Sequence, residues 1–290
     1  MPVEILKAMR PHQWVKNLFV VAPLIFAERA GDPERLKAIG IAFGLFCVFS
    51  GCVYILNDLL DVEQDRLHPV KRHRPIASGR LSVTWAWVSL VLLLAGAAAG
   101  AFLTSDALGA IACAYFALNV AYSLLLKRLP FIDVSVIAAG FVLRIYGGAA
   151  AIDVPLSIWL IVCTFLLAAF LGLGKRKHEL IVAGDGAVQQ RKVLKYYAPS
   201  TLKFAMLLLA LATAASYVAY VVVGETIQVF EPMELVWTIP CVLFGLWRFI
   251  SLTDRPGGGK SPTDLMLVDK AFVLNLVVWC AIVVTVIYAR

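Results

Sequence analysis

Four side chains that carry oxygen atoms stand close together on one short stretch of this chain. The stretch covers residues 57–65, and the four residues are Asn57, Asp58, Asp61 and Asp65. If a helix continues through it, the turn of about 100° per residue places all four within roughly a quarter of the circumference. Crowded carboxylates repel each other unless a cation lies among them, and hard oxygen ligands suit Mg²⁺, which completes its shell with waters and substrate phosphates. These four are therefore candidate Mg²⁺ ligands and candidate catalytic residues.

Basic residues follow the acidic stretch directly. Pro69 should end the acidic helix, and Pro75 with Gly79 should shape an ordered loop after it. Within this loop lie Lys71, Arg72 and Arg74. Their positive charge suits a multiply anionic ligand, because ammonium and guanidinium groups form charge-assisted hydrogen bonds with phosphate. The alternative is a solvated helix end with scattered salt bridges, but folding does not require so many aligned acids beside a membrane.

The elements that position these residues must be membrane-spanning helices. The chain has 290 residues, of which 61% are hydrophobic and only 16% are charged, and its mean hydropathy is +0.85. No soluble domain of this size needs so much apolar surface, whereas each spanning helix needs about 20 apolar residues. No long polar segment could fold alone outside the bilayer, so we expect residues 1–290 to form a single transmembrane domain.

Nine apolar runs indicate an all-α protein with nine transmembrane helices around a cavity that faces the cytosol. The runs cover residues 14–30, 38–56, 81–103, 105–126, 131–151, 155–174, 199–223, 233–252 and 270–289. The later eight are close to the length that a spanning helix needs. The first is short and Pro23 interrupts it, so a short re-entrant segment is the alternative there.

Lysine and arginine lie mainly on one side of this arrangement. If the amino terminus is cytosolic, 21 of the 26 basic residues fall in five cytosolic segments, 1–16, 57–80, 127–130, 175–203 and 248–270. Because positive charge is typical of cytosolic loops, the sequence predicts an inner (plasma) membrane protein whose amino terminus and active site are cytosolic. The net charge of +7 reflects this topology, so nucleic acid is not an expected partner.

The acidic stretch and the loop after it resemble a known family. The pattern Asn-Asp-x-x-Asp-x-x-x-Asp followed by Arg-Pro-Ile-x-Ser-Gly is similar to that of the UbiA superfamily of intramembrane transferases. The longer pattern, which adds His68-Pro69 and Lys71-Arg72, resembles the decaprenyl-phosphate (polyprenyl-phosphate) phosphoribosyltransferase branch. Further similar segments are 10–17, Tyr122-Ser123 with Lys127, 140–144 and 174–180.

The resemblance implies a Mg²⁺-dependent enzyme that transfers a 5-phosphoribosyl group from phosphoribosyl diphosphate to a polyprenyl phosphate and releases diphosphate. The resemblance and the charge pattern together place at the substrates Lys16, Asn17, Lys71, Arg72, Arg74, Tyr122, Lys127, Arg144, Lys175, Arg176 and Glu179. Some of these residues have an alternative that involves no substrate. Tyr122 could belong to an interfacial aromatic belt, and Arg144, inside the fifth run, could pair with an acid or with carbonyl groups for packing alone. For Lys16 and Asn17 the alternative is positive-inside topology alone.

The loop after the sixth run departs from the prenyltransferase pattern. UbiA-type prenyltransferases usually carry a second aspartate pair there, which binds a second Mg²⁺, whereas this chain offers Glu179 and Asp185 beside the basic run 175–177. A phosphoribosyl diphosphate, whose 5-phosphate also needs cations, is better served than a prenyl diphosphate. The acceptor phosphate is already an anion, so no strong general base is required, and none is obvious.

Two other functions remain open from the sequence. A prenyltransferase that joins a prenyl diphosphate to an aromatic acceptor would use the same Mg²⁺ chemistry, and the absent second aspartate pair weighs against it. A transporter or non-catalytic scaffold ranks last, because the charged residues cluster on one face and suggest no path for alternating access.

Overall fold

The computed structural model describes residues 1–27, 29–183, 192–222, 235–254 and 262–288. The regular elements among these residues are helices, which confirms the all-α class. The chain divides into two compact units, Met1–Leu124 with Leu143–Pro155 and Leu125–Val142 with Leu156–Arg290. Helix α7, Ile132–Ile152, contributes residues to both units.

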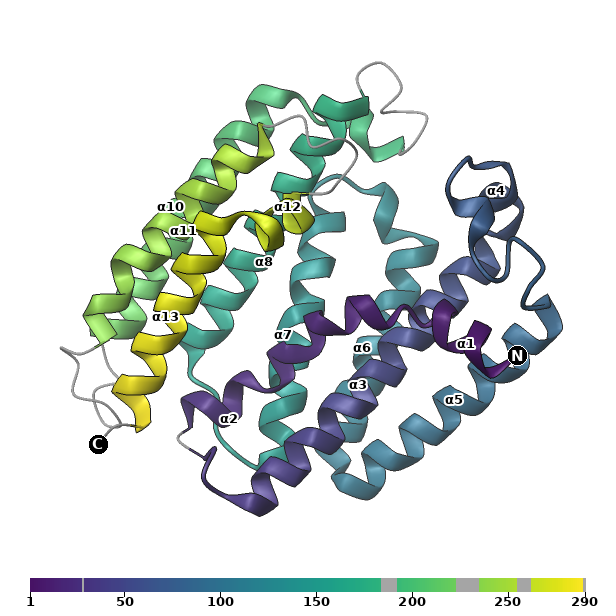
Figure 1. Cartoon of the computed structure of the whole chain (residues 1–290), viewed down its shortest axis with the longest axis horizontal. Helices are drawn as coiled ribbons and strands as arrows, with labels where there is room; N and C mark the ends of the chain where they lie inside the picture. Colours follow the sequence, from purple (N-terminus) through teal and green to yellow (C-terminus); the bar gives the residue numbers. More distant parts are fainter. Residues whose placement is uncertain (28, 184–191, 223–234, 255–261, 289–290) are drawn as a thin grey trace. The chain divides into compact units, whose positions relative to one another are not determined.

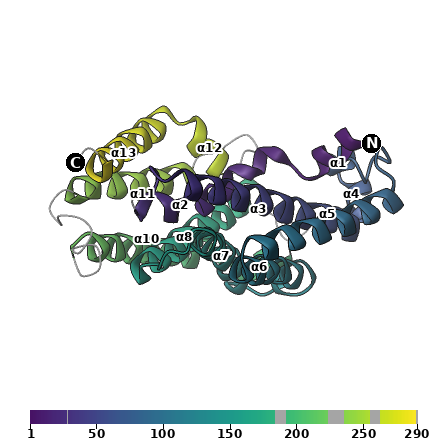
Figure 2. The same cartoon turned by 90° about the horizontal axis from the view of Figure 1, so that it is seen from below.

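The first unit is built around α3, Pro33–Leu60, against which α5, α6 and the amino-terminal segment pack (Figures 1 and 2). Asp32 caps the start of α3 by accepting hydrogen bonds from the backbone N–H groups of Glu34 and Arg35, and Pro33 occupies the first helical position. The other elements of this unit are α1 Pro2–Ala8, η1 Pro11–Val20, α2 Ala22–Phe26, α4 Val62–Leu67, η2 Lys71–His73, α5 Val83–Thr104 and α6 Asp106–Leu124.

The amino-terminal segment runs beside α3 without forming one long helix. The expected helix at 14–30 is instead the 3-10 helix η1 followed by the short helix α2, which Pro23 starts afresh because proline cannot continue a helix from the preceding turn. Arg10 contacts Asp58 near the carboxyl end of α3, and Asn17 contacts Ser50 further back along it.

Eight of the described helices are long and apolar enough to cross a membrane. They are Pro33–Leu60, Val83–Thr104, Asp106–Leu124, Ile132–Ile152, Ile158–Ile181, Pro199–Val222, Leu235–Thr253 and Lys270–Tyr288. These correspond to the eight later apolar runs. The prediction of nine regular transmembrane helices is thus corrected at its first member, where η1 and α2 replace a single helix.

Close approach between elements of the first unit depends on two adjacent glycines in α7. A Cβ atom at Gly147 would overlap the ring of Phe46, and one at Gly148 would overlap the carbonyl oxygen of Val20. Small residues at such contacts let neighbouring helices approach closely in a membrane. Both glycines therefore serve packing, and they let η1 lie against the second part of α7.

The second unit packs α8, Ile158–Ala183, against α10, Pro199–Val222, and α11, Ile239–Thr253, against α13, Lys270–Tyr288 (Figure 1). Its core includes Phe170 and Phe249, whose ring centroids lie 5.1 Å apart. The shorter elements are η3 Leu126–Arg128, η5 Lys192–Tyr196, η7 Leu235–Thr238 and α12 Pro262–Val268.

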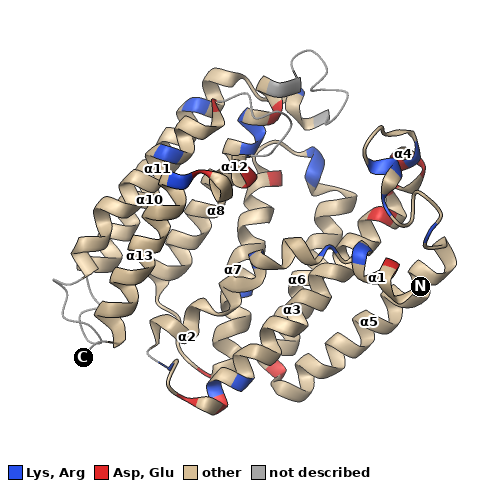
Figure 3. Cartoon of the chain, in the orientation of Figure 1, with Lys and Arg blue, Asp and Glu red and all other residues tan. Residues whose placement is uncertain are grey.

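Charged residues of each unit gather near helix ends, and most of the length between the ends is uncharged (Figure 3). In the first unit the largest group lies in the segment that joins α3 to α5. In the second unit charges occur at the carboxyl ends of α8 and α11. This distribution agrees with the expected membrane arrangement, because charged side chains are costly in hydrocarbon.

Candidate active site

The acidic stretch is bent rather than one continuous helix. Helix α3 ends at Leu60, Asp61 stands outside it, and α4 begins at Val62. Hydrogen bonds of the helical type still cross the break, from Asp61 N to Asn57 O at 3.0 Å and from Asp65 N to Asp61 O at 2.8 Å. The predicted straight helix is therefore wrong, although the spacing of the acids along the backbone is largely kept.

Two of the four predicted residues form the centre of the site. The side chains of Asp58 and Asp65 are each only 2% exposed, and Arg74 Nη1 donates to both, at 3.1 Å to Asp58 Oδ1 and 2.6 Å to Asp65 Oδ2. Arg10 Nη2 also donates to Asp58 Oδ1, at 2.5 Å. We call Asp58, Asp65, Arg10 and Arg74 the Asp58 group. Two buried carboxylates are thus held by two guanidinium groups from separate segments.

Arg10 was not among the predicted site residues. It precedes η1 in a left-handed backbone conformation, with φ of 53°, and its guanidinium carbon lies 4.8 Å from the ring centroid of Tyr54. Its membership of the motif 10–17 was the available signal. Spacing along the chain could not pair Arg10 with an acid 48 residues away, because that contact depends on how η1 returns along α3.

The loop after α4 is ordered as predicted. Helix α4 ends at Leu67, before Pro69, and His68 Nδ1 accepts hydrogen bonds from the N–H groups of Val70 and Lys71 at 3.2 and 3.3 Å. Further on, Gly79 has a φ of +77°, a conformation that favours glycine. Ile76 and Leu81 in this loop are buried. The buried residues and turn bonds fix the loop that carries Arg74.

The other basic residues of the loop lie nearer its surface. Lys71 Nζ is 3.9 Å from Asp65 Oδ1, so this lysine adds a third positive charge beside the two acids. Arg72 is exposed, and its Nε donates to His73 Nε2 at 3.3 Å. The structure therefore brings Lys71 and Arg74 to the acids and leaves Arg72 at the rim.

One observation indicates that these oxygen-bearing side chains could hold a divalent cation. Oδ2 of Asp58 is buried and has no hydrogen-bond partner. Within the described part of the chain, no three residues among His, Cys, Asp and Glu lie close enough to hold a metal by themselves. Mg²⁺ characteristically takes one or two carboxylates and completes its shell with water and substrate phosphate. Asp58 and Asp65 match that requirement, with Asn57 directly before Asp58 and Asp61 between the two in the chain.

A second polar network of the first unit surrounds Arg144 in α7. Arg144 Nε donates to Asn17 Oδ1 at 2.8 Å, and Nη2 donates to the Tyr115 hydroxyl at 2.7 Å. Asn17 Nδ2 donates in turn to Ser50 Oγ at 3.1 Å and to Cys47 Sγ at 3.3 Å. Arg144 and Asn17 were both predicted to bind substrate. The structure shows them joined to each other in a buried network, and Tyr115 was missed.

Three further predicted residues lie on short or terminal segments. Lys16 is half-buried in η1 directly before Asn17, and Tyr122 is half-buried near the carboxyl end of α6. Lys127 is half-buried in η3, in the second unit.

The predicted residues of the second unit centre on an ion pair within the protein. Arg176 is 1% exposed, and its Nε donates to Asp133 Oδ2 at 2.9 Å while its Nη1 donates to Glu179 Oε2 at 2.7 Å. The Tyr197 hydroxyl donates to Asp133 Oδ1 at 2.8 Å and accepts from Phe131 N at 2.6 Å. We call Arg176, Asp133, Glu179 and Tyr197 the Arg176 group.

Tyr197 is buried within this group, where water has little access. Burial raises the pKa of its phenol above the usual value, because the charged form would lose its hydration. Lys175, the first of the predicted basic run, is exposed. The second acidic residue expected in this loop, Asp185, lies outside the described residues.

The sequence matches a known protein family over most of its length. The model described as the UbiA prenyltransferase family matches residues 17–288. A decaprenyl-phosphate phosphoribosyltransferase of Corynebacterium glutamicum is 32% identical over 98% of this chain and 86% of its own length. A protein of the same description from Mycolicibacterium smegmatis is 31% identical, over 98% of this chain and 92% of its own length.

A solved structure shows the same fold. A UbiA homologue from Archaeoglobus fulgidus, bound to DMAPP and Mg²⁺, superposes with a TM-score of 0.73 at 19% identity and covers 99% of this chain and 100% of its own. At that identity the likeness concerns the arrangement of helices alone.

Proposed function

The chain belongs to the UbiA prenyltransferase family, and on that premise we propose that it transfers a 5-phosphoribosyl group from phosphoribosyl diphosphate to a polyprenyl phosphate, with release of diphosphate. Two relatives that match nearly the whole chain are described as decaprenyl-phosphate phosphoribosyltransferases, which supports both the transferred group and the acceptor. The enzyme is thus a transferase of the phosphoribosyl class, with residues 1–290 acting as one transmembrane domain.

The Asp58 group carries the proposal. One carboxylate oxygen of Asp58 is buried without a hydrogen-bond partner, and the side chains of Arg10, Arg74 and Lys71 lie beside the two aspartates. The group therefore suits a cation and a polyanion together. Asp58 and Asp65, with Asn57 and Asp61, would hold Mg²⁺. When bound, the metal would stabilise the negative charge that develops on the diphosphate leaving group.

The protein's own residues act by orientation and charge. Arg74 and Arg10 fix the two carboxylates, since each guanidinium bonds to Asp58. Lys71 and Arg72 would contact phosphate oxygens from the loop side. As the ribosyl carbon passes from diphosphate to the acceptor phosphate, one C–O bond breaks and one forms, and the acceptor needs no deprotonation because it is already an anion.

Two half-buried residues of the first unit, Lys16 and Tyr122, are assigned to phosphate oxygens, and the network of Arg144 and Asn17 holds η1 in place. For Lys127 and Lys175, which belong to the second unit, contact with substrate stays a prediction from the sequence. Arg176 and Glu179 are reassigned as positioning residues, because they bond to each other and Arg176 also bonds to Asp133.

The proposed orientation of the protein in the membrane depends on where its basic residues lie. The chain is an integral membrane protein, as its eight apolar helices and its family indicate. We propose that it lies in the inner (plasma) membrane with the Asp58 group on the cytosolic side, because most of the basic residues belong to segments on that side and phosphoribosyl diphosphate is a soluble polyanion.

A transfer assay tests this function directly. Phosphoribosyl diphosphate labelled in its ribose is mixed in detergent with the full-length protein, a polyprenyl phosphate and Mg²⁺, and the label in the lipid phase is counted with and without a chelator. We expect lipid-bound label that the chelator abolishes and that added Mg²⁺ restores. Absence of label, together with product from a prenyl diphosphate and an aromatic acid, would replace the proposal with prenyl transfer.

A further inference from the structure

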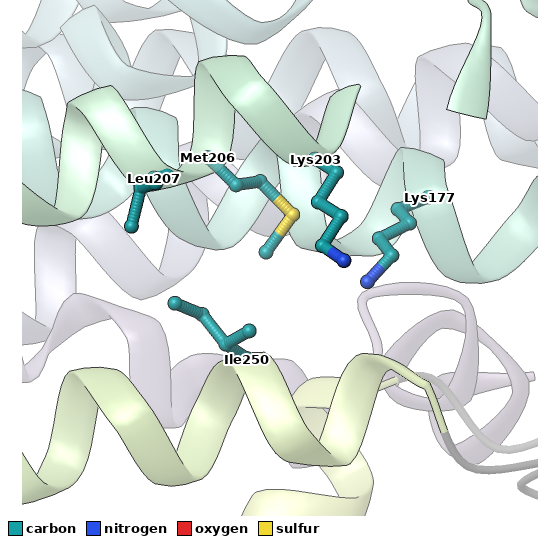
Figure 4. A pocket seen from close by; sticks show the side chains of 5 residues that line it. All are labelled: Lys177, Lys203, Met206, Leu207 and Ile250. Atoms are coloured by element: carbon teal, nitrogen blue, oxygen red, sulfur yellow. The ribbon is translucent and has the colours of Figure 1, made fainter. Parts of the chain in front are cut away.

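A crevice in the second unit has no part in the proposed reaction. It lies between α8, α10 and α11, has a volume of about 80 Å³, and is lined by Lys177, Lys203, Met206, Leu207 and Ile250 (Figure 4). This volume is several times the 10–15 Å³ that one water needs. The crevice therefore has room for part of a ligand larger than a water molecule.

Its two lysines differ in how their charges are balanced. Lys177, 5% exposed, pairs with Asp254 at 2.5 Å and donates to Thr253 Oγ1 at 3.3 Å. Lys203 is exposed and has no ion-pair or hydrogen-bond partner among the described residues. Figure 4 shows the two ammonium groups near each other at one end of the crevice. Asp254 balances the charge of Lys177 only, so among the described residues the charge of Lys203 stays unbalanced at that end.

The rest of the crevice is apolar. Met206, Leu207 and Ile250 form its wall away from the ammonium groups (Figure 4). On α10, Leu207 is 51% exposed, and the neighbouring Phe204, Leu208 and Leu211 are 50% to 63% exposed. On a membrane-spanning helix such a face contacts lipid chains. The crevice therefore lies beside an apolar surface that faces the bilayer, with its positive end at the start of α10.

We propose that this crevice binds a diacyl phospholipid with an anionic headgroup. Its phosphate would lie between the ammonium groups of Lys177 and Lys203, and an acyl chain would follow Met206, Leu207 and Ile250. Charge complementarity selects an anionic headgroup, and the exposed apolar face of α10 favours a lipid over a soluble phosphate. The bilayer supplies such lipids at high local concentration, and about 1 kcal/mol per basic residue is typical of their attraction. The inference does not rest on the proposed reaction.

Native mass spectrometry of the full-length protein in detergent tests the charge requirement. Dioleoylphosphatidylglycerol and dioleoylphosphatidylcholine are added at equal concentration, and bound lipid is counted. We expect phosphatidylglycerol to be retained preferentially and K203Q to weaken its binding about fivefold, which corresponds to one lysine. K195Q is the matched control, because Lys195 is an exposed lysine of the same unit that does not line the crevice. It should change the binding less than twofold.

A second pair of variants tests the apolar part while both charges stay in place. L207W fills the crevice from its exposed side and should weaken phosphatidylglycerol binding severalfold, whereas L208W adds the same ring to a residue that is equally exposed but does not line the crevice. Thermal unfolding of each variant checks that the protein is folded.

Three results would overturn the proposal. The first is equal binding of the two lipids, or equal effects of K203Q and K195Q, which would show no charge-selective site. The second is displacement of the lipid by glycerol phosphate at equal concentration, which would show that the apolar wall contributes nothing. The third is one-for-one displacement by a polyprenyl phosphate together with loss of transfer in K203Q, which would make the crevice the acceptor site.

Discussion

In the first unit two buried aspartates accept hydrogen bonds from arginines on separate segments and keep one carboxylate oxygen without a partner, whereas in the second unit one buried arginine lies between two acids. Some members of each group were predicted from the same kind of pattern, charged residues beside an apolar run. They are Asp58, Asp65 and Arg74 in the first unit and Arg176 and Glu179 in the second. The two groups differ in the polar atoms and charges that remain available to a ligand. The Asp58 group still offers an oxygen and nearby positive charge to a ligand, while the Arg176 group uses its charges to hold α7, α8 and the segment at Tyr197 together.

Loss of the Asp58 charge should have the largest effect on activity. D58N removes a metal ligand and leaves Arg10 and Arg74 without their shared acceptor charge, so we expect kcat/KM for phosphoribosyl transfer to fall on the order of 10³-fold. E63Q is the matched control, because Glu63 is an exposed acid of the same stretch that pairs with Arg66. A surface pair contributes at most about 1 kcal/mol, so E63Q should remain within a fewfold of the parent activity. Comparable losses in both variants would contradict the assignment.

Arg74 should matter next, because it holds Asp58 and Asp65 in one geometry. We expect R74Q to lower kcat/KM about 100-fold and R74K to recover part of that loss, since a lysine restores the charge but not the planar guanidinium. Steady-state transfer kinetics in detergent provide the measurement. R66Q, which changes an exposed arginine nearby, serves as the control. Equal activity of R74Q and R66Q would show that the bridge between the acids is dispensable.

A change in the Arg176 group should lower stability more than activity, which is the opposite of what we expect for the Asp58 group. R176M leaves Asp133 buried without its guanidinium partner, and removal of one partner of a buried pair costs about 3–5 kcal/mol. The midpoint of thermal unfolding in detergent should therefore drop by several degrees, whereas D58N should change it much less. A stable R176M protein that had lost transfer activity would show instead that Arg176 contacts substrate.

Tyr197 should produce the smallest effect, and it has a distinct pH signature. Y197F removes the hydroxyl bonded to Asp133 and Phe131 N, at a cost of about 1–2 kcal/mol in the free energy of unfolding. Burial raises the pKa of Tyr197 in the folded protein, so its contribution is complete below the unfolded pKa of about 10 and is lost as pH rises further. The stability difference between parent and Y197F should shrink above pH 10. A difference that is constant from pH 8 to 11 would contradict this interpretation.

The sequence by itself determined the membrane class, the later eight helices and the order of the loop after α4. These features depend on local properties, namely the length of apolar runs and the backbone limits of Pro69 and Gly79. It also singled out Asp58 and Asp65, which the structure joins through Arg74, because their spacing is visible along one short stretch of the chain. For the same reason it overlooked the break at Asp61, which lies between two helices that each look regular in sequence.

Only the tertiary structure decided which charges meet. The contact of Arg10 with Asp58, the network of Arg144 with Asn17 and Tyr115, and the pairing of Arg176 with Asp133 each join residues from elements far apart in the chain. Periodicity fixes the face of a helix on which a side chain lies, but the partner of that face depends on packing. A buried charge must find its partner in three dimensions, so the division between an open site and a closed ion pair could not be read from spacing alone.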